Sequence, residues 1–165
     1  AAILAKHYGA GKGIVIGRRR SKLKTAGECG ADIAVSTLDG DAEKKILEAT
    51  GGKGVDFTVE TSGGANSAMQ AVRITKKRGT IALLAFYEKL IHDFDLDLFV
   101  GKEQTMRGIM GEFGLVPEAC RVMAEGISLE KLITDEISLE DVPAFFAASD
   151  ENSGSRIKAI VKLDG

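Results

Sequence analysis

The sequence predicts an α/β fold, a doubly wound parallel sheet with helices on both faces. Short, continuously apolar runs alternate with helical segments along most of the 165 residues. Runs without apolar–polar alternation are typical of strands buried on both faces, as in parallel sheets. The spacing of runs and helices fits repeated strand–helix–strand units, and right-handed crossovers then place helices on both faces of the sheet.

The first helix and the first strand lie at the start of the chain. Residues 1–8 are interpreted as the last turns of a helix, which Gly9 ends. Residues 13–17 form a short apolar run, which predicts a strand. Residues 19–29 predict a second helix. Gly30 closes it, because glycine readily adopts the left-handed conformation beyond a helix end.

The same order of elements continues in the next stretch of sequence. Residues 32–35 and 55–60 predict two further strands. Residues 41–50 predict the helix between them, with Asp41 as the N-cap and the glycines at 51–52 as the end. The strand–helix–strand pattern therefore extends to residue 60.

A third helix and a fourth strand follow. Ala65, Ala68, Met69 and Val72 have the i, i+3, i+4, i+7 spacing of one helix face. Residues 79–84, in which four apolar residues follow Gly79 and Thr80, predict a buried strand. This helix therefore serves as the crossover between two parallel strands.

The last part of the chain has a weaker pattern. Residues 87–101 are predicted to be irregular, and residues 105–110 to form a strand. Apolar spacing predicts helices at about 115–126 and 141–149. Residues 157–163 predict the final strand.

Composition excludes several classes of protein. Two cysteines cannot form a disulfide scaffold or a four-cysteine zinc site. No apolar run approaches the roughly 20 residues that a membrane-spanning helix needs. Lys6, His7 and Lys12 interrupt the apolar start, which argues against a signal peptide. The apolar fraction of 44% argues against disorder.

Charge is distributed unevenly along the chain. Residues 1–27 carry a charge of +7 and contain no acidic residue, whereas the remaining residues carry −9, for a total of −2. The basic residues are Lys6, Lys12, Arg18, Arg19, Arg20, Lys22 and Lys24. A compact positive segment on an acidic body predicts an anionic ligand at one place. The alternative is an ordinary solvated helix face.

In doubly wound sheets, ligands bind beyond the carboxyl ends of the strands. The candidate loops therefore follow Ile16, Val35, Glu60 and Leu84. The loop after Ile16 holds the arginine cluster. The loop after Glu60 consists of the small residues 61–64, which let a ligand approach the backbone closely.

Seven short stretches, in one order and at one spacing, carry a family resemblance. They are Lys6–Ala10, Gly30–Asp32, Thr50–Asp56, Glu60–Gly63, Arg78–Ile81, Lys102–Glu103 with Arg107–Gly108, and Ile157–Leu163. In this set the chain resembles the medium-chain dehydrogenase/reductase family, which includes zinc-type alcohol, polyol and threonine dehydrogenases. The resemblance covers nearly the whole chain.

The resemblance implies the cofactor-binding, C-terminal part of such an enzyme. The implied fold is Rossmann-like but lacks the family's first strand and glycine-rich turn. Residues 1–150 are expected to be a partial dinucleotide-binding domain. Residues 151–165 are expected to hold a strand that in relatives packs toward the catalytic domain. The chain is therefore interpreted as a fragment without the N-terminal catalytic domain.

The resemblance also suggests which cofactor is bound. In enzymes that use NAD, an acidic residue at the end of the second strand contacts the adenosine ribose. The matching position is Gly17, followed by Arg18 and Arg19, with Lys22 close behind. Arginine binds a 2′-phosphate through charge-assisted pairs. We therefore expect NADP(H) to be preferred over NAD(H), the alternative being a generic basic helix start.

Other cofactor contacts are implied on two further loops and one strand. Thr61, Ser62 and Gly63 match the loop beside the nicotinamide ribose in relatives, although an ordinary turn is an equal alternative. Leu84 and Ala85 match the segment facing the nicotinamide amide, or are simply core residues. Lys158 matches a basic position near the pyrophosphate, or is a surface lysine.

The expected function is that of a cofactor-binding fragment of an oxidoreductase, which transfers hydride between NADP(H) and an alcohol or polyol. No catalytic residue and no metal ligand is expected in this chain; zinc would belong to the missing domain, and the fragment alone would be inactive. A cytoplasmic homo-oligomer is expected, with no nucleic-acid or membrane partner. The segment 93–99 alternates acidic and apolar residues, which suggests a subunit contact.

Two alternative functions remain open at this point. A zinc-free quinone or enoyl reductase of the same superfamily would share the whole cofactor part. A non-catalytic nucleic-acid-binding module could use the arginine run, but low aromatic content and the acidic body argue against it.

Overall fold

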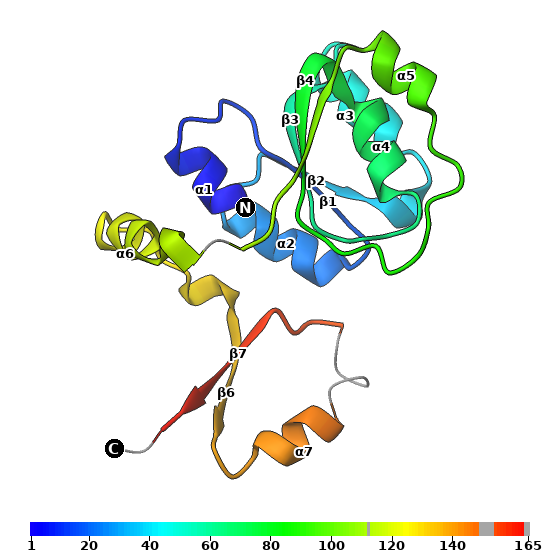
Figure 1. The fold of residues 1–165 in the computed structure, drawn as a ribbon. Helices are drawn as coiled ribbons and strands as arrows, with labels where there is room; N and C mark the ends of the chain where they lie inside the picture. The colour runs from blue at the N-terminus through cyan, green and yellow to red at the C-terminus, as the bar shows by residue number, and fades with distance from the viewer. Residues whose placement is uncertain (112, 149–153, 164–165) are drawn as a thin grey trace. The chain divides into compact units, whose positions relative to one another are not determined.

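The computed structural model describes residues 1–111, 113–148 and 154–163 (Figure 1). The helices are α1 (Ala2–His7), α2 (Arg20–Glu28), α3 (Ala42–Ala49), α4 (Ser67–Ile74), α5 (Leu96–Gly101), α6 (Val116–Ala124) and α7 (Val142–Ala147), with 3₁₀ turns η1 (Thr37–Asp39), η2 (Phe113–Leu115) and η3 (Glu130–Leu132). The strands are β1 (Ile14–Gly17), β2 (Ile33–Ser36), β3 (Val55–Glu60), β4 (Thr75–Leu83), β5 (Thr105–Gly108), β6 (Ile133–Ser138) and β7 (Lys158–Lys162).

The chain forms two compact units. The first comprises residues 1–40 and 115–165, and the second residues 41–114. The expected domain boundary between residues 150 and 151 lies outside the described residues.

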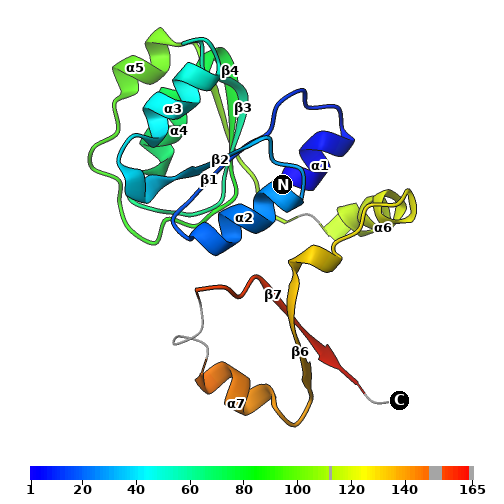
Figure 2. The same cartoon turned by 180° about the vertical axis from the view of Figure 1, so that it is seen from behind.

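The first unit contains two parallel strand pairs. β1 pairs with β2, with Ile14 opposite Ile33, and β6 pairs with β7. Figure 2 shows both pairs from behind. α2 packs on β1 and β2, and its Leu23 is buried together with Val35 of β2. The apolar run and amphipathic helix predicted for this stretch therefore form one packed layer.

The second unit has a three-stranded parallel sheet in the order β3–β4–β5. α4 packs on this sheet, and α3 packs on α4 (Figure 1). Met69, Ala71 and Val72 of α4 are buried with Ile81 of β4. Burial of one apolar helix face against a sheet is the main force that stabilises this layer.

Every strand pairing in the described chain is parallel, as the predicted fold class requires. Within the described residues no ladder joins the β1–β2 pair to the β3–β4–β5 sheet.

Most predicted elements are confirmed within a few residues, but the segment 87–101 is not irregular throughout. It contains α5, whose N-cap Asp95 accepts a hydrogen bond from Leu98 N at 2.8 Å. Phe94 and Phe99 pack against the core of the second unit. Their alternation with acidic residues therefore reflects one inward face and one solvated face.

Several smaller predictions need correction. Asp41 is the N-cap of α3, but its side chain pairs with Lys45 at 2.8 Å instead of capping the helix. β4 begins at Thr75, before the apolar run, because Thr75 already pairs with Val55 ahead of a shift in register. β6 was not predicted. Ala65 precedes α4 and is exposed, so it is not part of the buried stripe.

Candidate functional site

The predicted phosphate-binding residues lie at the junction of β1 and α2, in the first unit. Gly17 ends β1, Arg18 follows it, and Arg19 is the N-cap of α2. Both arginines are exposed, and Lys22 in the first turn of α2 is half-buried. Within the described part of the chain, no hydrogen bond or ion pair engages the guanidinium of Arg18.

The helix start itself favours an anion. The first turn of α2 contains no acidic residue, and the side chain of Arg19 makes no capping hydrogen bond to the helix. Unpaired backbone N–H groups at a helix N-terminus, together with the helix dipole, attract negative charge. A β-carbon on Gly17 would lie 3.3 Å from Leu23 Cδ2. Tight packing on Leu23 is thus a structural reason for glycine at this position.

Arg20 and the segment that leads into β7 lie next to this basic stretch, and both are held by polar contacts. Arg20 is paired with Asp39, Nη2 to Oδ1 at 3.1 Å. Ser21 Oγ donates a hydrogen bond to the backbone oxygen of Gly154 at 3.0 Å. This bond brings the segment that leads into β7 next to α2. Lys158, the first residue of β7, is exposed.

The second group of predicted residues lies at the carboxyl ends of β3 and β4, in the second unit. Thr61 and Ser62 are exposed, and Leu84 is 45% exposed. Gly63 has a φ of +62°, and a β-carbon there would lie 2.4 Å from the backbone oxygen of Phe86 and 3.3 Å from Ala85 Cβ. The structure therefore brings the two predicted loops into direct contact, which only glycine permits.

A buried carboxylate underlies this contact. Glu60, the last residue of β3, is only 7% exposed. Its Oε1 accepts hydrogen bonds from Ser62 N at 2.7 Å and Ser62 Oγ at 2.6 Å. Its Oε2 accepts from Tyr87 Oη at 2.6 Å and Gly63 N at 3.3 Å. Every lone-pair direction of the carboxylate is thus occupied by the protein itself.

Burial and hydrogen bonding act in opposite directions on the pKa of Glu60, whereas burial and the bond to Glu60 both raise the pKa of Tyr87. Burial would raise the pKa of Glu60, but the hydrogen bonds from Ser62, Tyr87 and Gly63 favour the charged form and leave the pKa below its ordinary value. Burial, reinforced by the bond to Glu60, raises the pKa of Tyr87 to about 12. At neutral pH the pair is therefore a phenol donating to a carboxylate.

Sequence reasoning missed both members of this pair as site residues. A charged residue ending a buried strand is the signal that could have singled out Glu60. No local pattern marks Tyr87, because its partner is 27 positions away in the chain.

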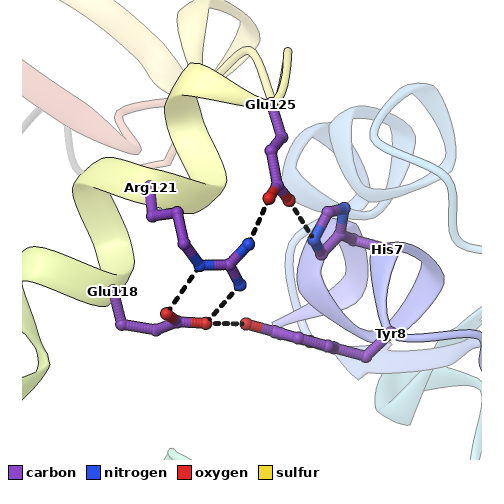
Figure 3. Close-up of polar contacts among 5 residues, drawn as sticks. All are labelled: His7, Tyr8, Glu118, Arg121 and Glu125. Carbon is purple, nitrogen blue, oxygen red and sulfur yellow. Dashed lines mark hydrogen bonds and ion pairs between the residues drawn. The ribbon is translucent and has the colours of Figure 1, made fainter.

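A second polar cluster joins α1 to α6 in the first unit (Figure 3). Tyr8 Oη donates to Glu118 Oε1 at 2.9 Å, and His7 Nε2 lies 3.3 Å from Glu125 Oε2. Arg121 donates to both glutamates. The guanidinium of Arg121, followed by the phenol of Tyr8, lowers the pKa of Glu118 to about 2. These groups are paired with one another on the surface, so the cluster serves as a link between the helices.

Neither metal ligands nor a membrane helix can be identified in the described ranges. Among these residues, no three His, Cys, Asp or Glu side chains gather as a metal site would require. Cys29 lies at the end of α2, and Cys120 is exposed on α6. None of the described helices has both the length and the apolar character needed to cross a membrane.

Comparison with known proteins decides the family. The model for the family described as zinc-binding dehydrogenase matches residues 1–125. The chain belongs to the zinc-binding dehydrogenase family. This result confirms the resemblance and the Rossmann-like fold inferred from the sequence.

Two relatives illustrate the match within this family. (R,R)-butanediol dehydrogenase of Bacillus subtilis is 35% identical over 124 residues, which are 73% of this chain and 35% of the relative. Sorbitol dehydrogenase of Halalkalibacterium halodurans is 26% identical over 165 residues, which are 98% of this chain and 47% of the relative. The chain therefore spans less than half the length of these two relatives.

Solved structures of family members agree with this result. The crystal structure of 2R,3R-butanediol dehydrogenase from Bacillus subtilis aligns with a TM-score of 0.88 at 27% identity, over 99% of this chain and 47% of that chain. An alcohol dehydrogenase zinc-binding domain protein from Burkholderia ambifaria aligns with a TM-score of 0.85 at 27% identity, over 100% of this chain and 45% of that chain.

Proposed function

We propose that this chain is the cofactor-binding part of an oxidoreductase, which transfers hydride between NADP(H) and an alcohol or polyol. The observation that carries the cofactor choice is the exposed Arg18–Arg19 pair directly after β1. The pair directly follows Gly17, the position at which NAD-dependent enzymes use an acidic residue to bind the ribose. One relative, an isopropanol dehydrogenase of Thermoanaerobacter brockii that is 39% identical over 83 residues, is named as NADP-dependent.

The residues present fit a 2′-phosphate. A guanidinium offers parallel N–H donors that match phosphate oxygens, and an acid at Gly17 would repel them. Arg18, Arg19 and Lys22 surround a helix start without acidic residues. In this proposal they hold the phosphate, and Lys158 interacts with the pyrophosphate.

The loops of the second unit are proposed to face the nicotinamide half. Thr61 and Ser62 are exposed beside Gly63, and Leu84 and Ala85 lie on the adjoining loop. Small residues and accessible backbone allow a flat ring to approach closely. When bound, NADP(H) supplies or accepts the hydride, while this chain orients it.

The described residues do not fit zinc, since they bring no three potential ligands together. Any zinc used by the enzyme is therefore proposed to be held by residues outside this chain. The chain alone is proposed to bind cofactor without catalysing the reaction.

The enzyme is also proposed to be a homo-oligomer. Support comes from large apolar side chains exposed on one stretch of the second unit: Phe86 at 78%, Leu90 at 83%, Leu96 at 64% and Val100 at 68%. Exposed apolar surface of this kind is typical of protein contacts. Sedimentation at micromolar concentration is expected to show a species heavier than 17.5 kDa.

The cofactor choice can be tested by measuring the affinities for NADPH and NADH in Arg18→Ala. Loss of a bidentate phosphate contact, at about 1.5–3 kcal/mol, corresponds to a roughly 10- to 150-fold weaker NADPH affinity. NADH affinity is expected to change little. Arg20→Ala is the matched control, since Arg20 is already paired with Asp39. Equal losses for both cofactors in Arg18→Ala would contradict the proposal.

A further inference from the structure

Glu60 and Tyr87 join the two loops that the proposed function assigns to the nicotinamide half. Glu60 ends β3, and Tyr87 lies in the segment that follows β4. Their bond, Tyr87 Oη to Glu60 Oε2, is 2.6 Å long. Because the carboxylate is buried, this charge-assisted bond forms away from competing water.

The carboxylate also organises its own loop. It accepts two bonds from Ser62 and one from Gly63 N, and Ser62 Oγ accepts a bond from Gly64 N at 3.3 Å. These bonds define the backbone course of residues 61–64. Glu60 therefore stabilises one loop directly and the other through Tyr87.

The loops meet at the backbone as well. Leu84 N donates to the backbone oxygen of Glu60 at 2.9 Å, which extends the β3–β4 ladder beyond the strands. One step further, Gly63 approaches the carbonyl of Phe86 so closely that a β-carbon would not fit. Three interactions thus set the separation of the two loops: the Leu84–Glu60 backbone bond, the Gly63–Phe86 contact and the Tyr87–Glu60 bond.

The accessible groups and the tethering groups are different residues. Thr61, Ser62 and Leu84 present exposed surface, whereas the acceptors of Glu60 are all used by the protein. Glu60 therefore has no free acceptor for a ligand, and the hydroxyl proton of Tyr87 is already donated to it. They can influence one only by fixing the loops that carry the exposed residues.

We propose that the Tyr87–Glu60 hydrogen bond is a positioning tether, which sets the spacing of the loops after β3 and β4 and so orients the nicotinamide half of the cofactor. The inference rests on the proposed function of these loops. Both members are positioning residues, since they act through residues 61–64 and 84–86. The tether is not needed to hold the adenosine half.

The test compares two probes in the full chain. NADPH carries both halves, whereas adenosine 2′,5′-bisphosphate has the 2′-phosphate but no nicotinamide. Tyr87→Phe keeps the ring and removes only the hydroxyl. We expect it to weaken NADPH binding about five- to tenfold, the effect of one hydrogen bond, and to leave the bisphosphate within about twofold. The fluorescence of the bound reduced nicotinamide should also move toward that of the free cofactor.

The matched control is Tyr8→Phe. Tyr8 also donates to a glutamate, Glu118, but on the surface between α1 and α6 (Figure 3). It should leave both probes unchanged. Equal NADPH losses in the two variants, or parallel losses of NADPH and the bisphosphate in Tyr87→Phe, would overturn the tether. A wild-type chain that binds neither probe would instead overturn the proposed function itself.

A second measurement checks the bond without any cofactor. The chain has two tyrosines and no tryptophan, so absorbance near 295 nm follows tyrosinate alone. With a pKa of about 12, Tyr87 stays largely protonated at pH 11. That protonated fraction should fall more in Tyr87→Phe than in Tyr8→Phe. Some remains in Tyr87→Phe, because the hydrogen bond to Glu118 also raises the pKa of Tyr8. Complete ionisation of both tyrosines near pH 10 to 11 in the folded wild type would show that the bond does not form.

Discussion

Replacing Gly63 by alanine tests the close approach of the two loops. A β-carbon at Gly63 would lie 2.4 Å from the carbonyl oxygen of Phe86, whereas carbon–oxygen contacts are ordinarily about 3.3–3.6 Å. The loops would have to separate by roughly 1 Å. Such a shift would stretch the Tyr87–Glu60 bond, which is 2.6 Å long.

Two costs add up at this position. Alanine at φ +62° is in the left-handed region, which costs about 1–2 kcal/mol. Forcing the carbonyl away costs a further 1–3 kcal/mol, roughly, as overpacking generally does. Reduced freedom of the unfolded chain offsets about 0.4–1 kcal/mol. We expect Gly63→Ala to lose about 2–4 kcal/mol in the free energy of unfolding.

Gly51→Ala is the control, because it isolates the first cost. Gly51 has a φ of +61° in the same unit, and its β-carbon would meet nothing within 4 Å. We expect it to lose about 1 kcal/mol. Urea unfolding followed by far-ultraviolet circular dichroism gives both values, provided that the slope with urea stays the same.

The decisive quantity is the difference between the two variants. Left-handed strain and unfolded-state entropy are common to both, so they cancel in the difference. About 1–3 kcal/mol should remain, attributable to the Phe86 carbonyl. Equal stability losses would refute the reasoning, since they would mean that the loop after β4 moves away from the β-carbon at no cost in free energy. Gly63→Ala should also weaken NADPH binding, whereas Gly51→Ala should not.

Three further predictions concern stability. Gln104 is buried, and its Nε2 donates to backbone carbonyls at the end of α4; Gln104→Leu should lose about 1–3 kcal/mol in urea unfolding, and an unchanged midpoint would contradict this. The Arg121 guanidinium holds the pKa of Glu118 at about 2, below its ordinary 4.5, so the stability that ionised Glu118 contributes is present above pH 4.5 and lost as pH falls toward 2. The drop in Tm between pH 6 and pH 3 should therefore be smaller in Glu118→Gln than in the wild type, and an equal drop would contradict a stabilising role for the Glu118–Arg121 pair. Arg78 has a φ of +61°, which is strained for arginine, and its exposed ion pair with Glu103 contributes little stability. Arg78→Gly should therefore raise the free energy of unfolding by about 1 kcal/mol, and a lower Tm would show that the ion pair contributes more than the strain costs.

The local pattern of the sequence was sufficient for most of the fold. The apolar run 13–17 became β1, and residues 81–83 became the end of β4, where Ile81 and Ala82 are buried. The stripe containing Met69 and Val72 likewise became the buried face of α4. The arginines after β1 could be located by their position alone, because ligand sites follow the carboxyl ends of strands.

Weaker or interrupted patterns misled the interpretation. α5 has only six residues and carries the acidic Asp97 among its apolar ones, so periodicity could not distinguish it from a loop. β6 has only two apolar residues, Ile133 and Ile137, separated by three polar ones, and it forms a strand by pairing with β7. Short elements of this kind are stabilised by tertiary contacts more than by propensity.

The sequence by itself therefore determined the fold class, the family and the basic segment at Arg18 and Arg19. Only the tertiary structure decided that Glu60 is buried, that Tyr87 reaches it, and that Gly63 lies against Phe86. The physical reason is the range of the interactions. The spacing of apolar residues along a helix or strand is a local property of the sequence. A hydrogen bond between residues 60 and 87 instead depends on how β3 and β4 are aligned in the sheet.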